Sequence, residues 1–247
     1  MSIVELARTA LPATVDPQIR LAAVSDLHVA TGGPEDDFRE HADRFCRLFD
    51  YLTGPLGVLP EAVHYLGDVL ELAGTPAGTT AGQILAHYPE VAGRIRPGVH
   101  LWGNHDRRSP LARLETIAVS GIHMEHGHRA DHWHTGRWAW VGRLACRLGG
   151  WLERIGLVDI DRTPAQVDDA AYRREFATRY DQYTTDHLRR HPQVGLYLFG
   201  HTHRPGLHRT IIDGLDRVVC NVGDFVGHCT AAVVSDGQVR LLQHVPS

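Results

Sequence analysis

The chain has 247 residues, of which 25 are basic and 29 acidic, and its formal net charge is −4. This balance excludes a basic protein that coats nucleic acid, because such binding needs many phosphate-neutralising cations. The sequence contains no lysine, which also excludes Schiff-base chemistry on a lysine. With 43% hydrophobic and 22% charged residues, the composition is typical of a globular domain. We expect a single domain over residues 1–247.

Neither a targeting segment nor a membrane-spanning segment is predicted. The N-terminal segment carries Glu5 within its apolar stretch and lacks the basic and hydrophobic regions of a signal peptide. No run approaches the roughly 18 apolar residues that a transmembrane helix needs. The four cysteines form no CxxC pair, which favours free thiols in a reducing compartment. We expect a cytoplasmic protein, with peripheral contact at the inner face of the membrane as an alternative.

Several short apolar runs end abruptly in polar clusters. Runs of this length, rich in valine, leucine and aromatic residues and bounded by glycine, predict buried strands. In open α/β sheets the functional groups gather beyond the carboxyl ends of the strands, so we expect the polar clusters to meet in space. The runs lie at residues 21–28, 62–68, 98–106, 121–128 and 194–203.

Helices are predicted between these strands. Apolar residues at helical spacing predict a helix over residues 38–53, and a weaker pattern predicts another over 79–95. Strands that alternate with helices favour the α/β class. Near the end of the chain, residues 217–225 and 231–242 are predicted to form strands, and the second segment turns at Asp236–Gly237.

The segment 129–192 breaks the alternation and is rich in tryptophan and arginine. Helical periodicity predicts helices over residues 140–155 and 165–188. We therefore expect a helical insertion that caps a core built on sheets. Its amphipathic face could cover acyl chains or lie at a membrane surface. The alternative is an ordinary cap that packs on the core of its own domain.

The clusters that follow the five strand-like runs are DxH, GD, GNHD, HGH and GHTH, in that order. Imidazole nitrogens and carboxylate oxygens together suit divalent transition metals. An aspartate can bridge two ions because both of its oxygens carry lone pairs. Over residues 21–224 the pattern resembles the calcineurin-like metallophosphoesterase superfamily. The resemblance implies an α/β fold in which a two-sheet β-sandwich is flanked by helices and carries a helical cap insertion.

The resemblance also implies two divalent metal ions, with manganese as the first expectation and iron, zinc or cobalt as alternatives. In the family, the ions share a hydroxide that attacks phosphorus. His105 of GNHD is then implied as the general acid, with Asp106 orienting its imidazole. One ion is implied to be held by Asp26, His28, Asp68 and His203, and the other by Asp68, Asn104, His126 and His201, so that Asp68 is the bridge.

Two further residues lie beside these motifs. Glu71 follows the GDxxE/D pattern of the family, which implies a hydrogen bond that supports the metal ligands. The alternative is a salt bridge that stabilises its loop. His128 occupies a position where the family more often has another residue, so we do not assign it to a metal.

The motifs also bear on the substrate. Protein serine/threonine phosphatases and dinucleoside polyphosphatases usually have GDxVDRG and RGNHE, whereas this chain has GDVLEL and WGNHD. The motifs SDLH, GHTHRP and NVGDF instead resemble those of UDP-2,3-diacylglucosamine pyrophosphohydrolases, although these tend to have GNRD and HGD. A phosphoester or pyrophosphate hydrolase acting on a small-molecule or lipid-linked substrate is thus implied. The candidate substrate contacts are Arg107, Arg108, Arg129 and Arg204, which could clamp a diphosphate, and Trp151 in the cap.

Two other functions stay open on the sequence alone. One is a phosphodiesterase acting on cyclic nucleotides or nucleic acid, since repair nucleases share this core, although the acidic charge disfavours extended nucleic-acid binding. The other is a metal-binding scaffold without catalysis, although scaffold members usually lose ligands and this chain has the full set. The oligomeric state also stays open.

Overall fold

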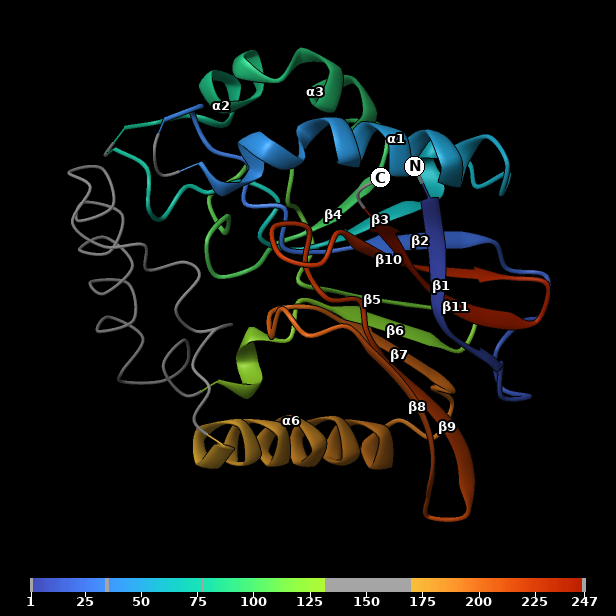
Figure 1. Cartoon of the computed structure of the whole chain (residues 1–247). Coiled ribbons are helices and arrows are strands. Elements are labelled where there is room, and N and C mark those ends of the chain that lie inside the picture. Colours follow the sequence, from blue (N-terminus) through green and yellow to red (C-terminus); the bar gives the residue numbers. More distant parts are fainter. Residues whose placement is uncertain (1, 34–35, 77, 132–169, 246–247) are drawn as a thin grey trace.

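The computed structural model describes residues 2–33, 36–76, 78–131 and 170–245. Two β-sheets pack face to face, and helices cover the outer face of each sheet (Figure 1). The layers are therefore helices, sheet, sheet and helix. The α/β class and the two-sheet sandwich expected from the sequence are confirmed.

The first sheet is built, within the described residues, from β1 (Ser2–Ala10), β2 (Leu21–Val24), β3 (Val63–Leu66), β4 (Val99–Leu101), β10 (Thr230–Ser235) and β11 (Gln238–Val245). Its strand order is β1-β11-β10-β2-β3-β4. The strands β2, β3 and β4 are parallel, whereas β10, β11 and β1 pair antiparallel. The carboxyl ends of the three parallel strands therefore lie at one edge.

The second sheet is built from β5 (Thr116–Val119), β6 (Ile122–Glu125), β7 (Leu196–Phe199), β8 (Gly206–Ile212) and β9 (Leu215–Asn221). Its order is β5-β6-β7-β9-β8. The inner strands β6, β7 and β9 are parallel, and the outer strands β5 and β8 pair antiparallel with their neighbours. The parallel strands of this sheet thus also end together.

The α-helices in the described ranges are α1 (Ala42–Thr53), α2 (Ala81–His87), α3 (Pro89–Ile95) and α6 (Ala170–Arg190). The first three cover the first sheet and α6 lies along the second (Figure 1). The helix expected over 38–53 starts as a 3₁₀ turn and continues as α1. The helix expected over 79–95 is divided in two, because Tyr88 precedes a proline and adopts φ −129° and ψ 67°.

The central strands β2, β6, β7 and β10 are buried along their whole length. In β2, Ala22 and Val24 pack in the cluster beneath α1 to α3, whereas Leu21 and Ala23 pack between the two sheets. This alternation with period two explains why the run is continuously apolar. A third cluster lies between α6 and the second sheet and includes Tyr180.

The C-terminal hairpin matches its predicted turn. Asp236 and Gly237 have φ angles of 53° and 71°, as the two central residues of a type I′ turn require. The turn divides the predicted segment 231–242 into β10 and β11. The strands β1, β5 and β8 were not predicted; β1 and β5 are largely exposed at sheet edges and lack a continuous apolar run.

Several expectations concern parts of the chain that are described incompletely. Of the helix expected over 165–188, the residues from Ala170 onward lie in α6. The helix expected over 140–155 lies outside the described residues, as does Cys146. The described cysteines, Cys46, Cys220 and Cys229, are free and buried. None of the helices in the described ranges is long and apolar enough to cross a bilayer.

Candidate metal centre

The candidate site lies where the parallel strands of both sheets end. Two backbone hydrogen bonds tie the loops together: the Asp26 N–H donates to the Gly67 carbonyl at 3.1 Å, and the His28 N–H donates to the Asp68 carbonyl at 3.0 Å. The predicted ligands all follow parallel strands: Asp26 and His28 after β2, Asp68 after β3, Asn104 after β4, His126 after β6, and His201 and His203 after β7.

Five of these residues have a left-handed backbone. The φ angles are 53° at Asp26, 50° at His28, 50° at Asp68, 66° at His201 and 55° at His203. Residues other than glycine rarely adopt this region, and each such residue costs on the order of 1–3 kcal/mol. Backbone strain that is concentrated in one place is typical of a functional site.

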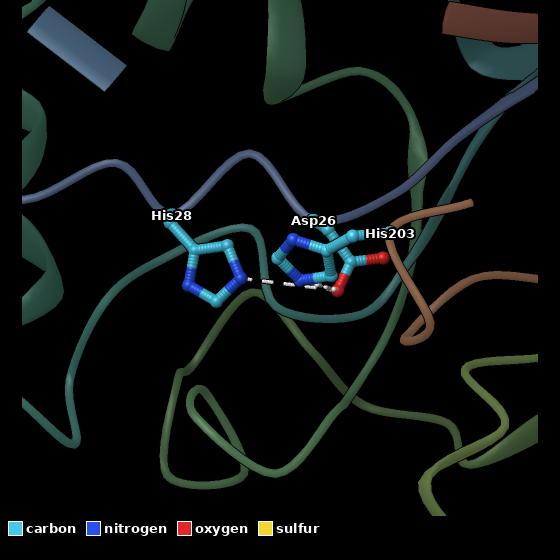
Figure 2. A group of neighbouring side chains, drawn as sticks. All are labelled: Asp26, His28 and His203. Atoms are coloured by element: carbon cyan, nitrogen blue, oxygen red, sulfur yellow. Dashed lines mark ion pairs between the residues drawn. The ribbon is translucent and has the colours of Figure 1, made fainter. Parts of the chain in front are cut away.

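One group of ligands is formed by Asp26, His28 and His203, and we call it the Asp26 site (Figure 2). Oδ1 of Asp26 lies 3.8 Å from His28 Nε2 and 3.3 Å from His203 Nε2. The other oxygen of Asp26 accepts the Ser25 hydroxyl at 2.5 Å and the His201 backbone N–H at 2.8 Å. Since Oδ2 is held in this way, Oδ1 is the oxygen that faces the two imidazoles.

The second group contains Asp68, His126 and His201. Together with Asn104 we call it the Asp68 site. His126 Nε2 lies 3.0 Å from Asp68 Oδ2, 3.2 Å from Asn104 Oδ1 and 3.2 Å from His201 Nδ1. The same nitrogen lies 4.0 Å from Asp26 Oδ1, so the two sites adjoin.

These donor atoms fit divalent cations. Asp26 Oδ1 and His28 Nε2 are buried and have no hydrogen-bond partner among the described residues. His126 Nδ1 donates to the Leu66 carbonyl at 2.8 Å, so Nε2 faces the oxygens of the Asp68 site and would present a lone pair to a bound cation. Buried lone pairs that face one another are unfavourable unless positive charge lies between them. Carboxylate, amide and imidazole ligands in this number suit manganese, iron, zinc or cobalt.

The pKa values of Asp26 and His126 also indicate that the site favours positive charge. Burial raises the pKa of Asp26, but the imidazoles of His126 and His203 together lower it by more than burial raises it. The net pKa of Asp26 lies well below the usual range. Burial lowers the pKa of His126, whereas Asp68 and Asp26 raise it, and the net value is about 9. The carboxylates of the site thus stay ionised and attract cations.

Two glycines of the motifs leave space for these carboxylates. A Cβ atom at Gly103 would overlap the carboxylate of Asp68, and a Cβ atom at Gly200 would overlap Ser25 and Asp26. Any other residue at Gly103 or Gly200 would therefore displace a predicted ligand. The glycines of GNHD and GHTH are thus steric requirements of the site.

The family comparison agrees with this geometry. The model of the Calcineurin-like phosphoesterase family matches residues 19–205, which is most of the chain. This chain belongs to that family.

Among solved structures, this calcineurin-like phosphoesterase is similar to a conserved uncharacterized protein from Streptococcus pneumoniae, described as a predicted phosphoesterase. The identity is 14% and the TM-score 0.37, over 87% of this chain and 83% of that chain. It is also similar to a single mutant of Vps29 from Entamoeba histolytica, with 15% identity and a TM-score of 0.39 over 90% of both chains. No curated protein matches the chain significantly.

In this calcineurin-like phosphoesterase, Glu71 links His105 to the Asp26 site. Glu71 Oε2 lies 2.6 Å from His105 Nδ1 and 2.9 Å from His28 Nδ1. Its other oxygen accepts the Gly74 N–H at 2.5 Å. Burial raises the pKa of Glu71, but the two imidazoles lower it well below its usual range. Glu71 therefore contacts both rings through one ionised carboxylate. Its motif implied a hydrogen bond to a metal ligand, which is the contact with His28, and the contact with His105 is additional.

Asp106 does not make the contact expected of it. Its Oδ1 accepts the Gly103 N–H at 2.7 Å and its Oδ2 accepts the Val69 N–H at 2.9 Å. Burial and the charge of Asp68 raise its pKa to about 6. Both oxygens of Asp106 are used by the backbone, so it holds the GNHD loop, and the carboxylate that contacts the His105 imidazole is that of Glu71.

One predicted substrate residue, Arg107, lies on an aromatic ring beside the GNHD loop. Its guanidinium carbon is 4.8 Å from the centroid of Trp102. Trp102 in turn lies 5.4 Å from the ring of His128, and His128 lies 5.4 Å from the ring of His126. His128 is absent from the groups of described residues that could hold a metal ion. Arg107 thus borders the site from the side of Trp102.

The remaining predicted substrate residues are less closely tied to the ligands. Arg108 is exposed. Arg129 forms an ion pair with Glu115 and has a half-exposed side chain, at 48%. Arg204 follows the last ligand, His203, and is half-buried. Trp151 lies outside the described residues.

Sequence reasoning missed the role of Asp224. Its Oδ2 lies 3.2 Å from His203 Nδ1, and its Oδ1 lies 2.9 Å from His228 Nδ1. The available signal was its place in NVGDF, because this motif follows β9 at the edge where the other motifs lie. Asp224 thus supports a predicted ligand from a segment that the ligand motifs do not include.

Proposed function

We propose that this protein hydrolyses phosphoester or pyrophosphate bonds with two divalent cations held at the Asp26 and Asp68 sites. The observation that carries the proposal is the convergence of the two sites. The separation of His126 Nε2 and Asp26 Oδ1 is only 4.0 Å. Membership of the calcineurin-like phosphoesterase family supports the same reaction class. We propose manganese as the ion to test first.

The ligand side chains define what each site does. When bound, a metal pair supplies Lewis acidity toward phosphoryl oxygens and lowers the pKa of water. Asp26 and Asp68 are buried anions that compensate the cationic charge, and Asn104 adds a neutral oxygen. We assign Asp68 as the bridge from the resemblance of its GD motif to that of the family. In the structure its Oδ2 faces His126, and its Oδ1 accepts the His105 backbone N–H at 2.8 Å.

We assign His105 as the proton donor to the leaving group. Its Nδ1 faces Glu71, which leaves Nε2 for the substrate. Burial lowers the pKa of His105, but Glu71 and Asp68 raise it well above the usual value, which favours the protonated ring. Its side chain is 14% exposed, so a leaving group can approach it from solvent.

For the substrate, we propose a nucleotide-linked diphosphate, with UDP-2,3-diacylglucosamine as the first compound to test. The resemblance of SDLH, GHTHRP and NVGDF to the motifs of pyrophosphohydrolases supports this class. The pair of Arg107 and Trp102 also supports it, because a guanidinium binds phosphate oxygens and an indole stacks on planar bases.

The substitution Asp68→Asn tests the reaction class. Loss of the bridging charge should lower the rate on bis(p-nitrophenyl) phosphate by more than about 100-fold. The matched control is Asp213→Asn, because Asp213 has a φ of 51°, close to that of Asp68, but is 63% exposed in the β8–β9 hairpin. Hydrolysis by Asp68→Asn at the wild-type rate would refute the bridging role.

A substrate panel tests the finer proposal. UDP-diacylglucosamine, a cyclic nucleotide and single-stranded DNA represent the competing classes. Fastest turnover of a cyclic nucleotide or of DNA would contradict the diphosphate substrate. Stoichiometric metal binding without turnover of any member would instead favour a scaffold.

A further inference from the structure

A second group of histidines lies away from the predicted metal ligands, between α6 and the second sheet. His123 on β6 is 6% exposed, and its ring centroid lies 4.0 Å from that of His187 on α6. The ring of His191 follows one helical turn later, 4.4 Å from that of His187. We call His123, His187 and His191 the imidazole cluster. It joins the sheet to the C-terminal end of the helix.

No carboxylate among the described residues pairs with these rings. Nε2 of His123 and Nε2 of His187 are buried and have no hydrogen-bond partner there. The carboxylate that β6 directs toward α6 is that of Glu125, and it accepts the hydroxyl groups of Tyr197 and Tyr183. A proton on the cluster would therefore have no anion to balance it.

The charged groups around the cluster on α6 and β9 oppose a further positive charge. Arg190 is adjacent to His191, and its charge adds to burial in lowering the pKa of His187 to about 3. Arg217 on β9 is 1% exposed and donates to the backbone carbonyl of the residue after His191 at 2.8 Å. The acidic neighbour on the helix, Asp186, is half-exposed and pairs with an arginine of α6. The cluster is thus stable as a set of neutral rings.

The helix α6 packs on a hydrophobic cluster of its own. The buried residues of this cluster are Tyr180, Leu188, Val194, Tyr197, Phe199, Ile212 and Val219. The core between the two sheets and the core beneath α1 to α3 consist of other residues. A helix that packs on a separate cluster can open while the rest of the domain stays folded.

We propose that the imidazole cluster makes the attachment of α6 acid-sensitive, so that protonation of its rings detaches the helix from the second sheet while the two-sheet core stays folded. Two imidazolium rings whose centroids are 4.0 Å apart repel each other, and detachment of α6 lets both rings take up their protons in water. The device is therefore a pH switch built into the contact between one helix and one sheet.

Detachment of α6 would also change the candidate metal centre. The ring of Tyr180 on α6 stacks on Phe199 with centroids 5.7 Å apart and lies 6.3 Å from the ring of the predicted ligand His201. Loss of this helix contact removes Tyr180 from beside His201. The effect on activity rests on the proposed function, whereas the detachment itself does not.

The experiment is hydrogen exchange of the full-length protein at pH 7 and pH 5, corrected for the intrinsic exchange rate at each pH. Peptides from α6 should lose protection at pH 5, whereas peptides from α1 should keep it. Burial is the main cause that lowers the pKa of His123 to about 4. Proton uptake by His123 alone should then raise the opening of α6 by about 20-fold between pH 7 and pH 5.

Phenylalanine variants keep a ring in the cluster but remove its titration. His123→Phe and His187→Phe should each reduce the acid-induced opening of α6 by about 10-fold, and the double variant should abolish it. The control is His208→Gln, because His208 is an exposed histidine on β8, and this variant should open like the wild type. If the double variant does not fold, the reduction in both single variants is the required result.

Three outcomes would overturn the inference. These are unchanged protection of α6 at pH 5, an equal loss of protection in α1 and α6, and an acid-induced opening that persists in the phenylalanine variants. A selective loss in a protein that hydrolyses no member of the substrate panel would support the inference and overturn only the proposed function.

Discussion

The substitution Asp106→Asn tests whether this carboxylate holds the GNHD loop or serves His105. In the structure Asp106 is 1% exposed and accepts the N–H groups of Gly103 and Val69. Asparagine keeps the shape but turns one acceptor into an NH₂ group, which leaves one buried backbone N–H without a partner. That change costs about 2 kcal/mol, within the usual range for a buried unsatisfied donor.

The expected loss of stability is measurable. For a protein of this size, about 2 kcal/mol corresponds to a decrease in melting temperature of about 4–8 °C. Calorimetry of the chelator-treated protein should show this decrease in the wild-type background and in the His105→Ala background alike. Asp43→Asn is the control, since the Asp43 side chain is 85% exposed, and it should not shift the melting temperature.

The competing role of Asp106 gives a different result. If Asp106 oriented the His105 imidazole, Asp106→Asn would lower activity as much as His105→Ala and would have no further effect in the double variant. An unchanged melting temperature combined with that pattern of activity would refute a loop-holding role.

Three further predictions concern other parts of the site and fold. Glu71→Gln should lower kcat by at least about 10-fold with little change in KM, because it leaves His105 without its anion; an unchanged kcat would contradict this role. Gly103→Ala should abolish Co²⁺ binding at the Asp68 site, since its Cβ would overlap Asp68, and intact binding would argue against that geometry. The melting temperature of the wild type should fall more between pH 7 and pH 5 than that of His123→Leu, when both are measured with chelator present. Burial and the charge of His191 lower the pKa of His123 from 6.5 to about 4. The stabilisation that His123 provides above pH 6.5 is therefore lost as the pH falls, by at most about 2 kcal/mol at pH 5.

The ligand set could be predicted from the sequence because its signals are local. Each short apolar run ends in a polar cluster, and parallel strands bring their carboxyl ends to one edge. Asp26 and His203 are distant in the sequence, yet the topology places them 3.3 Å apart. The edge strand β1 could not be predicted, because its sequence SIVELARTA is mostly exposed and its apolar residues are interrupted by Glu5 and Arg8.

The contacts around His105 could not be predicted in the same way. Asp106 is adjacent to His105 in the sequence, whereas Glu71 lies on another loop, so sequence proximity favoured Asp106 although the structure places Glu71 against the His105 ring. Adjacent residues in a tight turn point in different directions, and an aspartate there commonly binds backbone N–H groups nearby, as Asp106 does with Gly103. Which carboxylate faces an imidazole is a property of the assembled loops.

The strained backbone at the ligands explains why site and fold depend on each other. Five left-handed residues at about 1–3 kcal/mol each represent about 5–15 kcal/mol, which is comparable to the net stability of a whole domain. Such conformations persist only if neighbouring groups hold them, and here the neighbours are the other ligand loops. The Asp26 N–H donates to Gly67, and the His201 N–H donates to the Asp26 carboxylate. Hydrogen bonds from each ligand loop thus hold the left-handed residues of a neighbouring loop in place. The loops at the ends of the strands must therefore assemble together.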